Sequence, residues 1–193
     1  MAEHSGINTM SAWPSERTLR ILKEYRKRGG KIQWLGHTDI SSDPDRAYDG
    51  IQTCIDHGAV GIYIAGDVCE RIVFGGPENE IEKRVHILGE AMDFIKSNHL
   101  FAGIVSHAIK VTRVCEKYGV NPDFYMKTLH HHKYWSAQPD EVKGDFYATS
   151  QKSHDNMWCT DPQETIDFMK QVNRPWIAYK VLAAGAIHPM DGF

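Results

Sequence analysis

Polar side chains that can bind ligands or move protons recur where apolar, β-branched segments of the sequence end. His37 follows one such segment, Asp67 follows the next, and His107 follows a third. Imidazole and carboxylate groups on neighbouring strands can act as general acids and bases. We therefore predict a site in which Asp67, His37 and His107 are the catalytic residues.

A divalent metal centre is one form that this site can take. Neutral imidazoles and a carboxylate are common ligands of transition metals. The candidate ligands are His37, Asp67, His107 and His130. No HxH or HExxH spacing brings these residues together in the sequence. The alternative is that the histidines hydrogen-bond an organic ligand or one another.

Two lysines, Lys127 and Lys180, occur within otherwise apolar, strand-like segments. Burying an ammonium group without a partner is unfavourable, so each lysine needs a partner or a function. A desolvated lysine can form a Schiff base with a carbonyl compound, bind an anion, or form an ion pair with a neighbouring strand. We predict that both lysines bind the substrate, with these three roles left open.

A segment of about thirty residues, 130–160, has no helical or strand periodicity. Loops of this length in a compact domain are uncommon and often cover a binding site. Three consecutive histidines open the segment, and in an extended chain only His130 and His132 can face the same way. We predict that His130, Trp135 and Asp39 contact the substrate. The alternative is an insertion that packs on itself.

These residues are positioned by an alternation of strand-like and helix-like segments. Apolar runs predict strands at 7–10, 31–36, 60–65, 101–106, 123–129 and 176–182. Amphipathic spacing predicts helices at 15–28, 45–57, 79–98, 111–118 and 166–173, and residues 68–74 are interpreted as a second loop over the site. The alternation is typical of parallel βαβ units. We favour an α/β, TIM-barrel-like fold over an open doubly wound sheet, because no glycine-rich phosphate-binding turn follows an early strand.

Several segments resemble the aldo-keto reductase superfamily. The first strand and first helix of that superfamily are similar to residues 6–9 (GINT) and 15–19 (SERTL). Its fourth strand resembles residues 104–107 (IVSH), and its sixth strand resembles residues 177–185 (IAYKVLAAG). The resemblance implies a (β/α) barrel and an oxidoreductase-like enzyme that acts on a small polar carbonyl or sugar-like substrate.

The catalytic tetrad of that superfamily is not matched here. Its Asp, Tyr, Lys and His correspond to Ser11, a loop without tyrosine, His37 and Asp67. Reduction of a carbonyl needs an acid that protonates the oxygen, so we predict a divergent member with a non-standard active site. Two alternatives are a metal-dependent isomerase or hydrolase on the same barrel, and a non-catalytic ligand-binding or interaction module.

Composition narrows the choice of partners. The 193 residues include 22 Lys and Arg against 25 Asp and Glu, a net charge of −3, which argues against nucleic-acid binding. No apolar run is long enough to span a membrane. Four widely spaced cysteines are typical of reduced thiols. We predict one cytoplasmic domain over residues 1–193 whose partner is a small molecule.

The length is short for a TIM barrel, which usually needs about 250 residues and eight strands. Six predicted strands therefore indicate a fragment of a barrel. The edge segments 7–10 and 176–182 would then be exposed and could drive self-association. In the superfamily that this chain resembles, NADP phosphates bind after the seventh and eighth strands. The resemblance thus implies NADP only if those strands exist.

Overall fold

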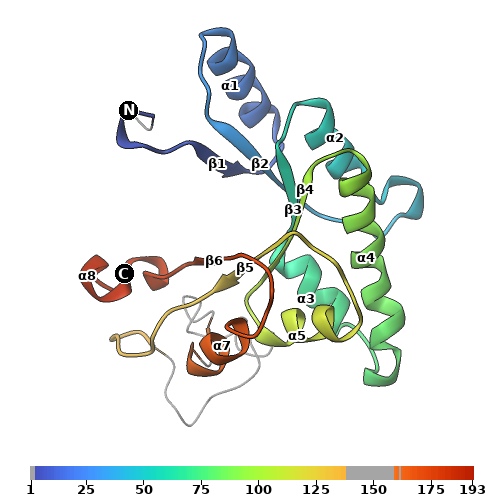
Figure 1. Ribbon diagram of the computed structural model, residues 1–193, viewed down its shortest axis with the longest axis vertical. Helices are drawn as coiled ribbons and strands as arrows, with labels where there is room; N and C mark the ends of the chain where they lie inside the picture. The colour runs from blue at the N-terminus through green and yellow to red at the C-terminus, as the bar shows by residue number, and fades with distance from the viewer. Residues whose placement is uncertain (1–2, 138–158, 161) are drawn as a thin grey trace.

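The computed structural model describes residues 3–137, 159–160 and 162–193. Six parallel strands form one sheet in the order β1-β2-β3-β4-β5-β6, and the sheet curls into a half-barrel (Figure 1). The strands are β1 (Thr9–Ala12), β2 (Gln33–Thr38), β3 (Gly61–Ile64), β4 (Phe101–Ser106), β5 (Phe124–Thr128) and β6 (Trp176–Tyr179). Each strand pairs with the next along the chain, as in a (β/α) barrel, whereas the strand order of a doubly wound sheet reverses. The predicted TIM-barrel-like α/β fold is confirmed.

Helices follow the strands and cover one face of the sheet. They are α1 (Glu16–Lys27), α2 (Asp49–Asp56), α3 (Gly66–Phe74), α4 (Ile81–Ser97), α5 (Ile109–Lys117), α7 (Pro162–Met169) and α8 (Pro189–Gly192). Short 3₁₀ turns occur at Glu3–Ser5, Pro44–Arg46, Glu78–Glu80 and Ala183–Gly185. No helix within the described ranges is long and apolar enough to cross a membrane.

The two faces of the sheet differ in chemistry. Ile62 and Ile64 of β3 are fully buried in the core that the sheet shares with its helices. Side chains alternate along a strand, so Tyr63 projects from the opposite face, where its register partner His37 lies beside it. That second face therefore carries aromatic and polar groups rather than the aliphatic core.

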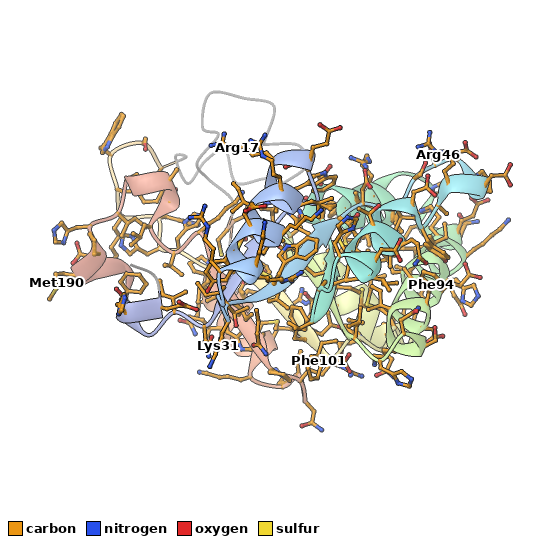
Figure 2. All side chains as sticks on the ribbon, turned by 90° about the horizontal axis from the view of Figure 1, so that it is seen from above. Arg17, Lys31, Arg46, Phe94, Phe101 and Met190 are labelled. Atoms are coloured by element: carbon orange, nitrogen blue, oxygen red, sulfur yellow. The ribbon has the colours of Figure 1, made fainter. Side chains whose placement is uncertain are left out.

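Many charged side chains lie on the outside of the molecule. Figure 2 shows Arg17, Lys31 and Arg46 projecting from its rim. Some apolar side chains are also exposed, among them Phe101 at the start of β4 and Ile177 of the edge strand β6, which are 64% and 45% exposed. Self-association through the edges β1 and β6 stays a prediction.

The prediction of a loop at residues 68–74 is wrong, because this segment belongs to α3. Val68, Cys69 and Val73 recur at helical spacing and are buried against the sheet. The polar pair Glu70 and Arg71 interrupts this apolar pattern in the sequence. The helix has a direct consequence for the site, because it turns one member of that pair inward and the other outward.

The last strand is shorter than its predicted range of 176–182. It ends at Tyr179, and the backbone of Lys180 turns into the left-handed region with φ 55°. That conformation is unfavourable for a residue other than glycine. The chain therefore turns away from the strand at Lys180, and the Lys180 side chain does not follow the alternation of side chains between the two faces of the sheet.

Candidate functional site

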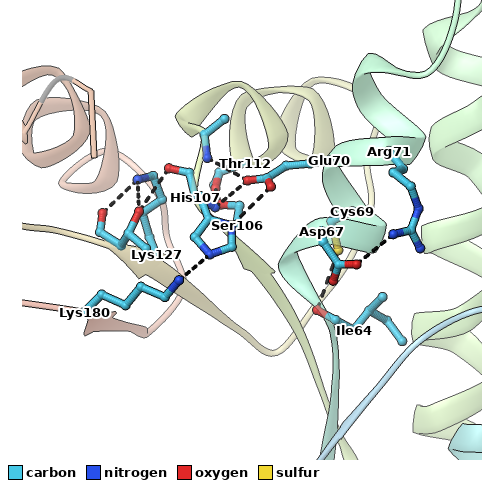
Figure 3. Close-up of polar contacts among 12 residues, drawn as sticks. Ile64, Asp67, Cys69, Glu70, Arg71, Ser106, His107, Thr112, Lys127 and Lys180 are labelled. Carbon is cyan, nitrogen blue, oxygen red and sulfur yellow. Dashed lines mark hydrogen bonds and ion pairs between the residues drawn. The ribbon is translucent and has the colours of Figure 1, made fainter. Parts of the chain in front are cut away.

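Three side chains from separate elements form a hydrogen-bonded chain beyond the carboxyl ends of β4 and β6 (Figure 3). Oε2 of Glu70 lies 3.1 Å from Nδ1 of His107. Nε2 of the same ring lies 3.0 Å from Nζ of Lys180. Glu70 belongs to α3, His107 directly follows β4, and Lys180 directly follows β6. We refer to this carboxylate, imidazole and amine as the Glu70–His107–Lys180 chain.

Glu70 is held in a single orientation. Its Oε1 accepts hydrogen bonds from the backbone N–H groups of His107 at 2.7 Å and Ala108 at 2.9 Å. These groups precede α5, whose N-cap Ala108 has no side-chain hydrogen bond, and a carboxylate is favourable beside the positive end of a helix. Glu70 is only 1% exposed. It therefore caps α5 with one oxygen and presents the other to the imidazole.

The backbone and ring of His107 are restrained from several directions. Its carbonyl oxygen accepts a hydrogen bond from Oγ1 of Thr128 at 3.1 Å. Its ring packs against Gly66, where a Cβ atom would lie 3.1 Å from Cε1 and Nδ1 of the imidazole. Neutral imidazole has one donor and one acceptor nitrogen. Because Nδ1–H donates a hydrogen bond to Glu70, Nε2 accepts the hydrogen bond from Lys180. The carboxylate thus sets the role of each ring nitrogen.

Lys180 is the member of the chain that borders open space. It is half-buried and lines an open hollow of about 430 Å³ whose other walls are Val181, Leu182, Ala184 and Phe193. Burial lowers the pKa of Lys180 to about 8, although the negative charge of Glu70 opposes this shift. At pH 7 roughly a tenth of such amines are neutral. Lys180 can therefore act both as an acid and as a neutral amine.

A buried hydroxyl group lies on the same side of the site. The ring of Tyr179 is 5.9 Å from the imidazole of His107, measured between centroids. Within the described part of the chain, the Tyr179 hydroxyl has no hydrogen-bond partner. Buried polar atoms are usually paired, so this hydroxyl is a natural place for a polar atom of a ligand.

Lys127 has a different environment, although it was predicted to bind substrate together with Lys180. It is 1% exposed, and its Nζ donates to the carbonyl oxygen of Thr128 at 2.8 Å and to Oγ1 of Thr128 at 3.1 Å. Thr128 in turn donates to His107. Lys127 therefore supports the backbone of the site from behind, and its enclosure argues against direct contact with a substrate.

Asp67, the carboxylate that we expected at the centre of the site, lies on the outer side of α3. Its side chain is 67% exposed and forms an ion pair of 2.7 Å with Arg71, one helical turn later. Glu70 takes the inward position instead and was missed by the sequence analysis. The sequence signal that could have found it is the apolar residue Val73 three positions later, because residues three apart share a helix face.

His37 lies among aromatic rings on the concave face of the sheet. Its ring stacks on Tyr63 with centroids 4.9 Å apart and meets the edge of Trp13 at 5.0 Å. Burial lowers the pKa of His37, against the opposing charges of Asp67 and Asp39. The hydroxyl of Tyr63 hydrogen-bonds to Ser11. This environment favours a neutral imidazole that packs against a ligand or its neighbours.

The remaining predicted contacts are dispersed. Asp39 lines a separate hollow of about 560 Å³ that also includes Arg71 and Arg84. Trp135 is 91% exposed and covers nothing within the described residues. Most of the predicted loop 130–160 lies outside the described residues, so its role as a lid stays a prediction.

His130 has a structural role in the described part of that segment. It is 4% exposed, and its Nε2 accepts a hydrogen bond from the backbone N–H of Cys159 at 3.0 Å. His132 also hydrogen-bonds to the carbonyl oxygen of Cys159. Burial lowers the pKa of His130 to about 4. These histidines join the end of β5 to the chain before α7.

The predicted metal ligands are not gathered together. Among residues 3–137, 159–160 and 162–193, no three His, Cys, Asp or Glu side chains are close enough to hold a metal ion. The set His37, Asp67, His107 and His130 is divided among the environments described above. The structure instead combines His107 with Lys180 and with the unpredicted Glu70.

Comparison with known proteins adds no relatives to this picture. Neither a scan against protein-family models nor a search of curated proteins found a match for this chain. The resemblance to aldo-keto reductases stays a prediction.

Proposed function

We propose that this chain acts as an enzyme on a small polar carbonyl compound, with the Glu70–His107–Lys180 chain as its acid–base centre. The observation that carries the proposal is the continuous hydrogen bonding from a buried carboxylate through an imidazole to an accessible amine. A carboxylate that orients a histidine, which in turn serves a third group, is a recurring arrangement for proton transfer. Relationship to the aldo-keto reductases, with a replaced tetrad, is part of this proposal.

The position of the centre supports the proposal. His107 and Lys180 directly follow strands β4 and β6, at the carboxyl end of a parallel sheet. Enzymes with (β/α) barrels place their active sites at this end. The hollow beside Lys180 supplies space for a ligand, and the Tyr179 hydroxyl, which has no hydrogen-bond partner among the residues that the structure describes, offers a polar contact.

Each group has a defined task in this proposal. The Lys180 ammonium donates a hydrogen bond to the carbonyl oxygen and protonates it as negative charge develops there. The Nε2 atom of His107 receives or returns the proton of Lys180, and Glu70 stabilises the imidazolium that forms. Polarising the carbonyl in this way acidifies the C–H bonds of the adjacent carbon, and Nε2 of His107 accepts the proton that leaves this carbon and returns it to Lys180.

Hydrogen exchange in D₂O tests the proposal without requiring a known product. Dihydroxyacetone and glyceraldehyde are incubated with the protein, and deuterium at the carbon next to the carbonyl is followed by NMR. We expect exchange above the buffer rate, and a loss of about 100-fold or more in Lys180→Met and His107→Asn. Asp67→Asn is the matched control, because it changes an exposed carboxylate one turn away. If the unchanged protein binds these compounds but does not catalyse deuterium exchange, the result would favour a non-catalytic ligand-binding module.

A further inference from the structure

We propose that Lys180 also forms a covalent imine with the carbonyl compound. This inference rests on the proposed function, because it assigns a bond to the same amine and the same class of substrate. It differs from acid–base chemistry alone, in which Lys180 exchanges only protons. Three features of the structure support it: the access of Nζ, its proton acceptor, and the backbone that presents it.

Access comes first, because the nitrogen must approach a carbonyl carbon. Lys180 lines the open hollow of about 430 Å³, and the surrounding Val181, Leu182 and Phe193 side chains are apolar. A partly apolar surrounding disfavours the ammonium form of lysine and favours the neutral nucleophile. Burial does lower the pKa of Lys180 to about 8, in agreement with this environment.

The proton acceptor is the imidazole of His107. Its Nε2 lies 3.0 Å from Nζ, within hydrogen-bonding distance, and Glu70 holds the opposite nitrogen. Removal of one proton from the ammonium group by Nε2 leaves a lone pair on Nζ. His107 then carries that proton until a leaving group needs it.

The backbone at Lys180 lies in the left-handed region, which residues other than glycine seldom adopt. Lys180, Ala183 and Ala184 all have positive φ angles, of 55°, 43° and 55°. Strained residues of this kind occur preferentially at functional sites. The turn at Lys180 ends β6 and directs the side chain to His107 instead of along the sheet.

The covalent step balances with one molecule of water as the by-product. The lone pair of Nζ forms a bond to the carbonyl carbon while the π electrons of the C=O bond move to oxygen, and one of the two protons on the nitrogen passes to that oxygen. The nitrogen lone pair then forms the C=N bond as the C–O bond breaks, and the nitrogen keeps its last proton as a protonated imine. The proton stored on His107 leaves with the oxygen as water. Neither an oxidant nor a reductant takes part.

Reductive trapping tests this inference. The protein is incubated with dihydroxyacetone and sodium cyanoborohydride, which reduces an imine to a stable amine, and labelled peptides are quantified by mass spectrometry. Lys23, on the solvent side of α1, serves as an internal reference for ordinary surface lysines. We expect labelling at Lys180 at least ten times faster than at Lys23. Lys180→Arg should abolish that adduct while leaving the fold and the Lys23 adduct unchanged.

A second variant tests the role of His107. His107→Asn should slow labelling at Lys180 by about ten-fold or more, and it should leave labelling at Lys23 as it is. Labelling of Lys180 no faster than Lys23 in the folded, unchanged protein would overturn the inference. If hydrogen exchange persists in that case, the acid–base proposal stands and only the covalent step fails. Labelling at Lys180 without exchange would support the imine and contradict the proposed turnover.

Discussion

Lys127 and Lys180 are two lysines of similar acidity in very different surroundings. They lie at the ends of the adjacent strands β5 and β6, where Lys127 pairs in register with Ala178. Burial lowers the pKa of each to about 8. Lys127 is enclosed and bonds to its neighbour Thr128, whereas Lys180 borders a hollow and bonds to His107.

A lowered pKa therefore does not by itself identify a reactive lysine. Lys127 continues the strand alternation of Tyr125, so its side chain is buried within the fold. Lys180 lies one residue past its strand in a left-handed conformation, which breaks the alternation. Access and a proton-accepting partner distinguish the second lysine from the first.

The largest effect is expected at Glu70, which holds the imidazole that Lys180 contacts and, within the described ranges, has no hydrogen bond to Lys127. Glu70→Ala removes the acceptor of three N–H groups and leaves two of them unpaired at the start of α5. We expect a loss of roughly 3 kcal/mol in unfolding free energy, measured by urea denaturation. Glu70→Gln keeps an acceptor oxygen and should lose less unfolding free energy than Glu70→Ala. Equal stability of Glu70→Ala and the unchanged protein would contradict the capping role.

A smaller effect, of about 2 kcal/mol, is expected from the pH dependence of stability at Lys127. Its pKa in the folded protein is lowered to about 8, below the ordinary value for an unfolded chain, so the unfolded state binds more protons between the two. The contribution of Lys127 to stability therefore rises as pH increases from 8 to 10. The measurement is the unfolding free energy of the unchanged protein minus that of Lys127→Met at each pH.

Lys127→Met is informative because Lys180 titrates in both the unchanged protein and the variant, so its contribution cancels when the two unfolding free energies are subtracted. Buried cysteines and tyrosines, whose pKa values are raised, also titrate in both and cancel in the difference. A difference that stays constant from pH 8 to 10 would show that Lys127 is not desolvated. Labelling of Lys180 by dihydroxyacetone should persist in Lys127→Met, because the two amines have separate partners.

The smallest effect is expected at Gly66, beside the ring that Lys180 contacts. In Gly66→Ala the new Cβ atom would lie 3.1 Å from the His107 ring, so the imidazole must shift by a few tenths of an ångström. We expect a stability change of about 1 kcal/mol or less. The exchange activity should fall more than stability does, because small displacements weaken proton transfer. Gly89→Ala is the matched control, since its Cβ would meet no atom within 4 Å.

The alternation of strands and helices could be predicted from residue types alone. Residues 101–106 form β4 as predicted, because a run of apolar residues that is buried on both faces has a strong local signature. The same reasoning failed at residues 68–74, where Glu70 and Arg71 obscure the buried face of α3. A charged residue in a short helix is predicted to be exposed unless the distant residues that hydrogen-bond to it are known.

Residue periodicity was enough to predict the parallel α/β architecture, and it placed His107 at a strand end and Lys180 within a strand-like segment, because both are local properties. The folded arrangement was needed to show that β6 ends before Lys180, that Glu70 joins these two residues, that Asp67 faces away, and that Lys127 is enclosed. Those outcomes depend on which residues of α3, β4 and β6 meet across separations of 37 and 73 residues. Side-chain direction at a helix face or a strand end follows from packing against distant elements, and one residue of displacement reverses it.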